Sequence, residues 1–222
     1  MIETTTAPLS ASDLVLCDFD GTISRIDTGL HIAETLKLDK FMEIEMIWRD
    51  GKISSRECMA RQWRTVDPSN ETFQRIIATA EPNPGFQDLV RLTRARGSRF
   101  IVLSDGLDFY IETMLERLGM DDIEFRANHA IMHEHHIEMT FPHGAHECEH
   151  CGNCKTKWLF ELRPGFERTV YIGDGFSDAC ASAYCDVVFA KDSLERLCRE
   201  RDQEYFPFDT LHDVVNVLND GV

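Results

Sequence analysis

The sequence predicts an α/β fold with a doubly wound, mostly parallel sheet of the Rossmann-like kind, and two observations support this. First, four short apolar runs each stop at a small or polar residue, as buried parallel strands do. Second, a helical pattern follows each run, so that strands and helices alternate along the chain. The four runs are residues 14–17, 100–103, 170–172 and 187–190.

The interval after the first run, residues 28–82, contains only helix-like segments without strand-like alternation. A stretch of about 55 residues is enough for a small lobe. We therefore predict an α/β core of residues 1–27 and 83–222, with a helical cap of residues 28–82 inserted after the first strand. The apolar residues of this cap include Ile44, Ile47, Trp48, Met59, Trp63, Phe73, Ile76 and Ile77.

The later elements have recognisable ends. Asn83 and Pro84 mark the start of one helix, and Gly97 marks its end. A second apolar helical stripe ends at Gly119. Residues 123–141 alternate on either side of a histidine-rich stretch, and a small β-hairpin is the simplest structure for that pattern.

Acidic residues dominate the charge, because 39 Asp and Glu against 23 Lys and Arg give a net charge of −16. This balance argues against a nucleic-acid partner, since phosphate contacts need clustered cations. A small phosphorylated substrate is still compatible with it where a metal ion or a few cations reverse the local field. No apolar run of about 18 residues is present, so we expect no membrane span. The N-terminal residues lack the basic and apolar regions of a signal peptide, which predicts a cytoplasmic protein.

Candidate catalytic residues stand at the carboxyl ends of three predicted strands, where ligands bind in open α/β sheets. Asp18 and Asp20 follow the first strand, Ser104 follows the second, and Asp174 and Asp178 follow the third. Two carboxylates that flank one residue point the same way when strand geometry continues. A lone Asp-x-Asp would more often be an Asx-turn. Because candidate residues also stand at the other two strand ends, we favour a site shared by all three over an Asx-turn.

Four aspartates gathered at one edge of a sheet cannot all stay ionised without a cation, because like charges repel strongly in a site of low dielectric constant. Oxygen ligands with no histidine nearby indicate Mg²⁺ rather than zinc. Lys155 stands at the predicted start of another helix, and together with a hydroxyl and backbone amides it would hold a phosphate group. The sequence therefore predicts a Mg²⁺ site beside a phosphate site.

These residues resemble motifs I to IV of the haloacid-dehalogenase superfamily of phosphatases. Residues 18–22, Asp-Phe-Asp-Gly-Thr, match motif I in full, and residues 173–178 match motif IV closely. Ser104 and Lys155 match the shorter motifs II and III, and a helical cap between motifs I and II is typical of subclass I. Asp105 stands where glycine is more usual after the motif II serine, and we expect activity to tolerate this.

The resemblance implies a role for each matched residue. Asp18 would be the nucleophile that forms an aspartyl-phosphate, and Asp20 would protonate the leaving alkoxide and later deprotonate water. The groups implied for Mg²⁺ are Asp18, the main-chain carbonyl of Asp20, Asp174 and, in a supporting position, Asp178. The residues implied for phosphate binding are Ser104, Asp105 and Lys155.

Finer similarity points to a phosphoserine-phosphatase-like branch of the family, and within it to the methionine-salvage phosphatases that act on 2-hydroxy-3-keto-5-methylthiopentenyl-1-phosphate. Phosphoserine phosphatases and phosphocholine/phosphoethanolamine phosphatases are alternatives in the same branch, and a phosphomutase of the same architecture is a further enzymatic alternative. The segments that carry this similarity are residues 128–130, 141–143, 151–155, 189–192 and 205–208.

Residues at the entry to the predicted cap are candidates for substrate contact. Asp27 would bind a hydroxyl or a cationic head group, or merely cap the next helix. Arg25 would reach the substrate phosphate, or be an exposed hinge residue. Trp48, Met59 and Trp63 would line an apolar pocket for a methylthio tail or form the hydrophobic core of the lobe, and we favour the lobe core.

A cluster of cysteines and histidines precedes Lys155. Cys148, Cys151 and Cys154, with His146 as a fourth ligand, resemble a zinc knuckle or a redox pair. A structural zinc site more often has two separated half-sites, so a loop of reduced thiols is equally compatible. Zinc at this position would brace the loop that leads to Lys155. A separate alternative is a metal or redox sensor on a retired phosphatase scaffold, although the intact set of Asp18, Asp20, Lys155 and Asp174 speaks against it.

Overall fold

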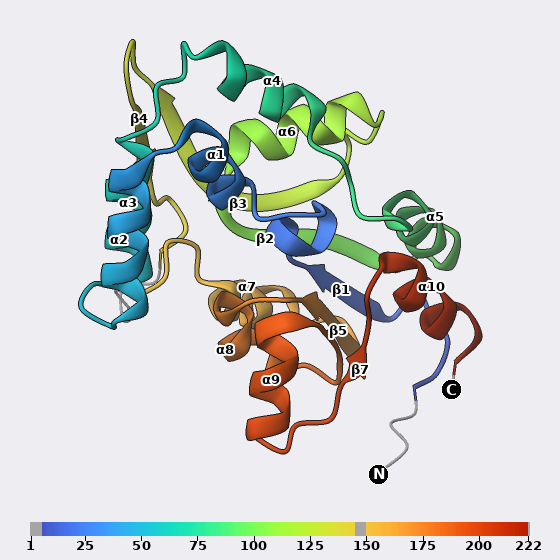
Figure 1. Ribbon diagram of the computed structural model, residues 1–222. Helices are drawn as coiled ribbons and strands as arrows, with labels where there is room; N and C mark the ends of the chain where they lie inside the picture. The colour runs from blue at the N-terminus through green and yellow to red at the C-terminus, as the bar shows by residue number, and fades with distance from the viewer. Residues whose placement is uncertain (1–5, 145–149, 222) are drawn as a thin grey trace.

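One seven-stranded sheet organises the protein in this computed structural model, which describes residues 6–144 and 150–221 (Figure 1). The strand order is β4-β3-β2-β1-β5-β6-β7, and neighbouring strands are parallel except for the antiparallel pair β3–β4. This confirms the predicted α/β fold. The strands are β1 Asp13–Cys17, β2 Arg99–Leu107, β3 Glu124–Met132, β4 Ile137–Thr140, β5 Arg168–Gly173, β6 Val187–Ala190 and β7 Phe206–Pro207.

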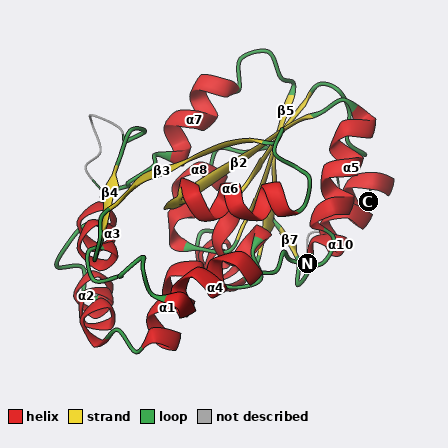
Figure 2. Cartoon of the chain, turned by 90° about the horizontal axis from the view of Figure 1, so that it is seen from above, coloured by secondary structure: helices red, strands yellow, loops and turns green. Residues whose placement is uncertain are grey.

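Helices cover both faces of the sheet, as the doubly wound fold requires (Figure 2). Residues of the first helical set share one buried cluster with one face of the strands, and residues of the second set share another cluster with the opposite face. The first set is α5 Phe86–Arg96, α6 Asp108–Arg117 and α10 Leu211–Asp220. The second set is α7 Lys155–Leu162, α8 Ala179–Ser182 and α9 Asp192–Glu200.

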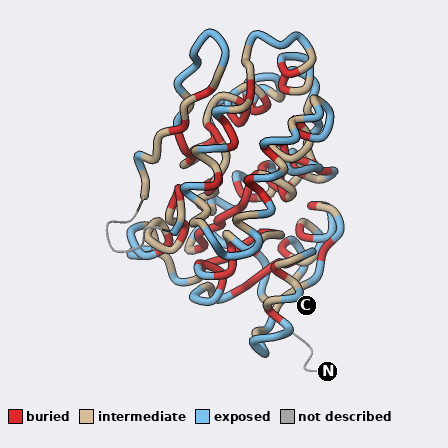
Figure 3. Tube along the Cα trace, turned by 60° about the vertical axis from the view of Figure 1, so that its left-hand side comes forward, coloured by how far each residue is buried: buried red, intermediate tan, exposed pale blue. Residues whose placement is uncertain are grey.

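Strand β1 shows why its residues form a central strand. Val15 and Cys17 face the first helical set, whereas Leu14 and Leu16 face the second. All four are fully buried, because side chains alternate across a strand and both faces are covered. Figure 3 shows that buried segments run through the interior of the protein, whereas exposed segments are mostly at its periphery. A continuous apolar run is therefore the expected sequence of this strand, and it brings the next residue, Asp18, to the carboxyl edge of the sheet.

Residues 28–82, which we call the cap segment, form four helices: α1 Thr28–Leu36, α2 Asp39–Arg49, α3 Ser55–Trp63 and α4 Glu71–Thr79. Three of these helices begin at a side chain that accepts a hydrogen bond from the first turn. Asp27 accepts from Leu30 N–H, Ser54 from Glu57 N–H, and Asn70 from two N–H groups of α4. The segment contains no strand among its residues, as the sequence predicts.

Two adjacent chain segments, residues 23–25 and 81–83, connect the cap segment to the core, and we call them the two crossings. Ser24 and Pro82 form an antiparallel bridge. Next to it, Arg25 N–H donates to Glu81 O at 3.2 Å, and Asn83 N–H donates to Ile23 O at 2.6 Å. The two crossings are thus tied together by backbone hydrogen bonds where the segment joins the sheet.

Element boundaries differ from the prediction in two places. Helix α5 begins at Phe86 rather than at Asn83, because Gly85 adopts a φ of 94° and the Asn83 side chain accepts from Leu211 N–H at 3.3 Å. Strand β2 continues to Leu107, with a shift of register against β3 after Leu103. The predicted hairpin is confirmed as β3–β4, and it extends the main sheet at one edge. No helix in the described ranges has the length and apolarity that crossing a membrane requires.

Candidate functional site

A cavity of about 850 Å³ lies between the carboxyl ends of the central strands and helices α2 and α3 of the cap segment. Its strand-end wall includes side chains from the segments that follow β1 and β5 and from the end of β2. The predicted site residues on this wall are Asp18, Asp20, Ser104, Asp105 and Asp174. The fold therefore brings together residues that are more than 150 positions apart in the sequence.

A tight turn after β1 connects the first and third strand ends. Gly21 has a φ of 77°, and a Cβ atom on it would lie 2.5 Å from Asp174 Oδ2, so this position requires glycine. The neighbouring Thr22 hydroxyl donates to Asp174 Oδ1 at 2.6 Å. The Gly-Thr pair that follows Asp20 thus has two physical roles: Gly21 leaves room for the Asp174 carboxyl group, and Thr22 orients that group.

Asp178 shapes the loop that carries Asp174. It is fully buried, and its Oδ2 accepts from the N–H groups of Asp174 at 3.0 Å and Gly175 at 2.9 Å. Its Oδ1 accepts from the Tyr171 hydroxyl at 2.7 Å. A Cβ atom at Gly173 would lie 2.5 Å from the same carboxyl group, so the backbone approaches it closely. Asp178 fixes the loop through these bonds and leaves Asp174 to face the cavity.

Lys155 is the one cation buried among these carboxylates in the described part of the chain. Its Nζ lies 2.7 Å from Asp18 Oδ1 and 2.6 Å from Asp178 Oδ1, and it donates to Ser177 Oγ at 3.1 Å. Burial alone would lower the pKa of Lys155, but the neighbouring carboxylates outweigh burial and raise the pKa above its usual range. Lys155 therefore carries its positive charge throughout the physiological range.

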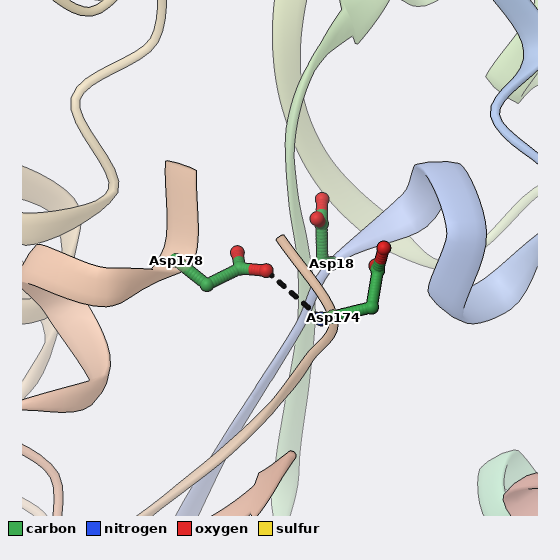
Figure 4. A group of neighbouring side chains, drawn as sticks. All are labelled: Asp18, Asp174 and Asp178. Carbon is green, nitrogen blue, oxygen red and sulfur yellow. Dashed lines mark hydrogen bonds between the residues drawn. The ribbon is translucent and has the colours of Figure 1, made fainter. Parts of the chain in front are cut away.

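Three carboxyl groups converge closely enough to hold a metal ion (Figure 4). One oxygen each from Asp18, Asp174 and Asp178 lies within 4.8 Å of the others. Burial and the charge of Asp178 raise the pKa of Asp18, and the same two causes raise that of Asp174 to about 7. Three carboxylates and the Lys155 ammonium leave a formal charge of −2, so an oxygen-bound divalent cation fits this donor set.

The Asp20 side chain lies outside that group of oxygens. Its Oδ1 accepts from Thr28 N–H at 3.1 Å, and its Oδ2 accepts from the Tyr110 hydroxyl at 2.6 Å. Burial raises the pKa of Asp20, while the hydrogen bonds from Thr28 and Tyr110 oppose that rise. The two aspartates of the Asp-x-Asp pair thus have separate surroundings, one beside Lys155 and the other beside a tyrosine.

The end of β2 is joined to the loop that leads into Lys155. Asp105 Oδ1 accepts from Asn153 N–H at 2.8 Å, and Asn153 Nδ2 donates to Ser104 O at 2.9 Å. Asn153 Oδ1 in turn accepts from Trp158 Nε1 at 2.8 Å. Asp105, which stands where glycine is more usual, therefore anchors the chain two residues before Lys155.

Four residues with structural roles in the site were missed by the sequence reasoning: Thr22, Tyr110, Asn153 and Tyr171. Thr22 belongs to a matched motif and could have been selected on that ground. Asn153 likewise lies in one of the segments that carry the family similarity, residues 151–155. Tyr110 and Tyr171 have no signal in the sequence, because a buried polar side chain is recognised only by its partner. The partner of Tyr110, for example, is 90 positions away.

The facing wall comes from the cap segment. Glu45 is buried and accepts from Arg49 Nε at 2.9 Å and from Gln62 Nε2 at 3.0 Å, which ties α2 to α3. Asp27 also lines the cavity, and desolvation together with the charge of Asp20 raises its pKa to about 7. The apolar residues of this wall include Phe41, Trp48, Met59 and Trp63.

Two sets of predicted residues lie elsewhere. Arg25 is exposed, 3.5 Å from Glu81, and lines a separate cavity of about 450 Å³. Of the proposed zinc ligands, His146 and Cys148 lie outside the described residues, Cys151 lines the main cavity, and Cys154 immediately precedes α7. Across residues 6–144 and 150–221, the aspartate group is the one set of side chains placed to hold an ion, so a zinc site has no support there.

Comparison with known proteins gives a consistent result. A sequence model of the haloacid dehalogenase-like hydrolase family matches residues 15–182. A 2-hydroxy-3-keto-5-methylthiopentenyl-1-phosphate phosphatase of Bacillus cereus (strain G9842) is 31% identical over 208 residues, which cover 92% of this chain and 94% of that protein.

Solved structures show the same fold. A phospho-aspartyl intermediate analogue of phosphoserine phosphatase superposes with a TM-score of 0.70 at 21% identity and covers 92% of this chain and 96% of its own. A substrate-bound phosphoserine phosphatase complex gives a TM-score of 0.71 at 20% identity, with 93% and 98% covered. At these identities the likeness concerns the fold.

Proposed function

Because this chain belongs to the haloacid dehalogenase-like hydrolase family, we propose that it is a Mg²⁺-dependent phosphomonoesterase that works through an aspartyl-phosphate. It is a phosphatase, as the curated relatives are. The observation that carries the proposed mechanism is the meeting of Asp18 and Asp174 in one cavity at the carboxyl edge of the sheet, with the buried Lys155 Nζ 2.7 Å from Asp18 Oδ1.

In the first half of the reaction, an oxygen of Asp18 attacks phosphorus and the bond from phosphorus to the ester oxygen breaks. Both Phe19 N–H and Lys155 Nζ contact Asp18 Oδ1, each at 2.7 Å, which leaves Oδ2 as the attacking atom. Asp20 gives its proton to the leaving ester oxygen, so the alcohol departs neutral. Lys155 and Ser104 hold the phosphoryl oxygens.

In the second half, water attacks phosphorus and the bond to Asp18 breaks. Asp20, now a carboxylate, takes the proton from that water, so inorganic phosphate is released and both aspartates return to their starting states. One group on the cavity wall thereby acts as acid and then as base. Its position beside Asp18, with a single residue between them, allows both steps without a change of fold.

We assign the metal position to Asp18 and Asp174, with the main-chain carbonyl of Asp20 as a further ligand and Asp178 in support. When bound, Mg²⁺ supplies positive charge that reduces the repulsion between a carboxylate nucleophile and an anionic phosphate ester. Lys155 adds a fixed positive charge at the same place. The carboxylate oxygens suit Mg²⁺, which prefers oxygen ligands.

For the physiological substrate, we favour 2-hydroxy-3-keto-5-methylthiopentenyl-1-phosphate. The support is the Bacillus cereus relative, which is named for this substrate and aligns over nearly the whole of both chains. Trp48 and Met59 on the facing wall would suit an apolar tail. Phosphoserine is the second candidate, because the structural relatives are phosphoserine phosphatases. Its carboxylate would need a cation on a wall where Arg49 is already paired with Glu45.

The proposed function is tested with purified protein, p-nitrophenyl phosphate and added Mg²⁺, with and without EDTA. We expect turnover that EDTA abolishes and Mg²⁺ restores. The Asp18→Asn variant should lose activity and keep its circular dichroism spectrum and melting temperature. Turnover by Asp18→Asn at the wild-type rate would contradict the nucleophile assignment, and turnover that EDTA leaves unchanged would contradict the metal requirement. Rates on the two candidate substrates then decide between them.

A further inference from the structure

The surroundings of Asp20 contain one side chain that the proposed mechanism does not use. Tyr110, on α6, is 4% exposed, and its hydroxyl donates to Asp20 Oδ2 at 2.6 Å. The other oxygen of Asp20 accepts from Thr28 N–H, at the start of α1. Each oxygen of this carboxyl group therefore has its own donor, one from α6 in the core and one from α1 in the cap segment.

The position of the Tyr110 hydroxyl is tightly constrained. A Cβ atom on Gly106 would lie 1.7 Å from the hydroxyl oxygen, so the absence of a side chain at Gly106 gives the tyrosine its path to Asp20. The ring packs against three aromatic rings, with centroid distances of 5.3 Å to Phe109, 5.8 Å to Phe19 and 6.1 Å to Trp63. Since a buried ring in such packing has one stable orientation, the hydroxyl is directed at Asp20.

We propose that Tyr110 is a positioning residue for the general acid, one that holds the Asp20 carboxyl group in the orientation needed for proton transfer. This inference rests on the proposed phosphatase function. When the bond from phosphorus to the ester oxygen breaks, the Asp20 proton moves to that oxygen and the carboxyl group becomes a carboxylate. The Tyr110 hydroxyl and Thr28 N–H then donate to the two oxygens that share the new negative charge.

The same contacts link Asp20 to the cap segment. Thr28 begins α1, and Trp63, which packs on the Tyr110 ring, ends α3. Two of the contacts around the acid group thus come from the cap segment, whereas Phe19, Gly106 and Phe109 set the position of the Tyr110 hydroxyl from the core side.

The test compares Tyr110→Phe with the wild type on phenyl phosphate and p-nitrophenyl phosphate in the presence of Mg²⁺. Phenolate is a strongly basic leaving group and needs the proton, whereas p-nitrophenolate is a weak base and leaves without it. We expect the variant to lower kcat about 10- to 100-fold on phenyl phosphate and less than about threefold on p-nitrophenyl phosphate, with KM unchanged for both. Tyr184→Phe, which removes a hydroxyl from an exposed tyrosine, serves as the matched control and should match the wild type.

Further variants make the result specific to Asp20. In an Asp20→Asn background, Tyr110→Phe should cause no additional loss on phenyl phosphate, because the group that it positions is already absent. Gly106→Ala would displace both the Tyr110 hydroxyl and Asp20 Oδ2, so it should give a selective loss that is at least as large. The melting temperature and circular dichroism spectrum of Tyr110→Phe, whose ring keeps its aromatic neighbours, check that this variant folds. Equal losses on both esters, or no loss on phenyl phosphate, would overturn the inference alone. A wild type without Mg²⁺-dependent turnover would overturn the proposed function and the inference with it.

Discussion

The two walls of the cavity are built in different ways. On the strand-end wall, polar side chains are supported by buried partners: Asp178, directly behind the wall, accepts from two backbone N–H groups, a tyrosine and a lysine. On the cap-segment wall, apolar side chains predominate, and the buried Glu45 is tied only to its neighbours on α2 and α3. A scaffold of this kind holds the reacting groups rigidly and leaves the facing wall free to differ between enzymes.

The comparison predicts where each change will act. Substitutions on the strand-end wall should reduce the chemical step or metal binding for all esters, since every ester presents the same phosphoryl group. Substitutions on the cap-segment wall should change the ranking of esters and leave phosphate binding intact. A substitution on either wall with the opposite effect would break this division.

The largest effect is expected for Lys155→Met. Loss of the ammonium leaves Asp18 and Asp178 without their shared cation, so kcat should fall about 10²- to 10³-fold. The unpaired buried carboxylates should also lower the free energy of unfolding, measured in urea with EDTA present, by about 3–5 kcal/mol. Lys157→Met, on the same helix at a half-exposed position, is the matched control and should change neither quantity. Near-wild-type turnover by Lys155→Met would contradict its assigned place at the phosphate.

A smaller effect, on metal binding, is expected for Asp178→Asn. Asp178 orients the loop that carries Asp174, and such supporting groups typically contribute a factor of about 10 to 100 to metal affinity. The Mg²⁺ concentration for half-maximal activity should rise by that factor, with kcat partly recovered at saturating Mg²⁺. A lowered melting temperature with an unchanged Mg²⁺ requirement would mean that Asp178 supports only the fold.

On the cap-segment wall, Trp48→Ala should raise KM for the preferred ester about three- to tenfold through lost apolar contact. The inhibition constant of inorganic phosphate should stay the same, because phosphate contacts only the strand-end wall. Met46→Ala, an exposed position on α2 outside the cavity lining, is the control and should leave both constants unchanged. Equal weakening of ester and phosphate by Trp48→Ala would show that the two walls are not independent.

The smallest effect is expected for Asp27→Asn and depends on pH. In the folded protein the pKa of Asp27 is about 7, above the ordinary value of 3.8, so the native state holds a proton there that the unfolded state has lost. Stability from this group is therefore present at low pH and is lost as pH rises towards 7. Asparagine keeps the helix cap without the charge.

The melting temperature of Asp27→Asn should consequently exceed that of the wild type at pH 8, and the difference should shrink at pH 5. We expect the difference in the free energy of unfolding to be less than about 1 kcal/mol, because Asp27 is exposed and solvent screens its charge. A difference that grows towards pH 5 has the wrong sign for a raised pKa.

Much of the strand-end wall could be predicted from the sequence. Continuous apolar runs identified β1, β2, β5 and β6, and parallel strands present their carboxyl ends at one edge, so Asp18, Ser104 and Asp174 had to lie near each other. Lys155 was correctly placed at the start of a helix. These inferences succeeded because they depend on periodicity and on chain direction, both of which are local properties.

Other features could not be predicted. Strand β7 has two residues, too few for a pattern, and β2 continues past its polar residues because pairing with β3 resumes at Leu107. The sequence allowed either a substrate contact or a helix cap for Asp27. The structure shows that Asp27 caps α1 and also lines the cavity. Arg25 lines a different cavity. It lies where the two crossings pair through their backbones, with its N–H donating to Glu81 O.

The sequence by itself determined the architecture and selected the candidate reacting groups, because apolar periodicity and a short motif at a strand end are written along consecutive residues. Only the tertiary structure decided which carboxylate oxygen of Asp18 and of Asp20 accepts each hydrogen bond, and that the donors to Asp20 are Tyr110 and Thr28. It also decided that Asp105 anchors the loop that leads to Lys155. The physical reason is that a hydrogen bond between distant segments depends on where two backbones come to lie, and no local pattern of residues encodes that distance.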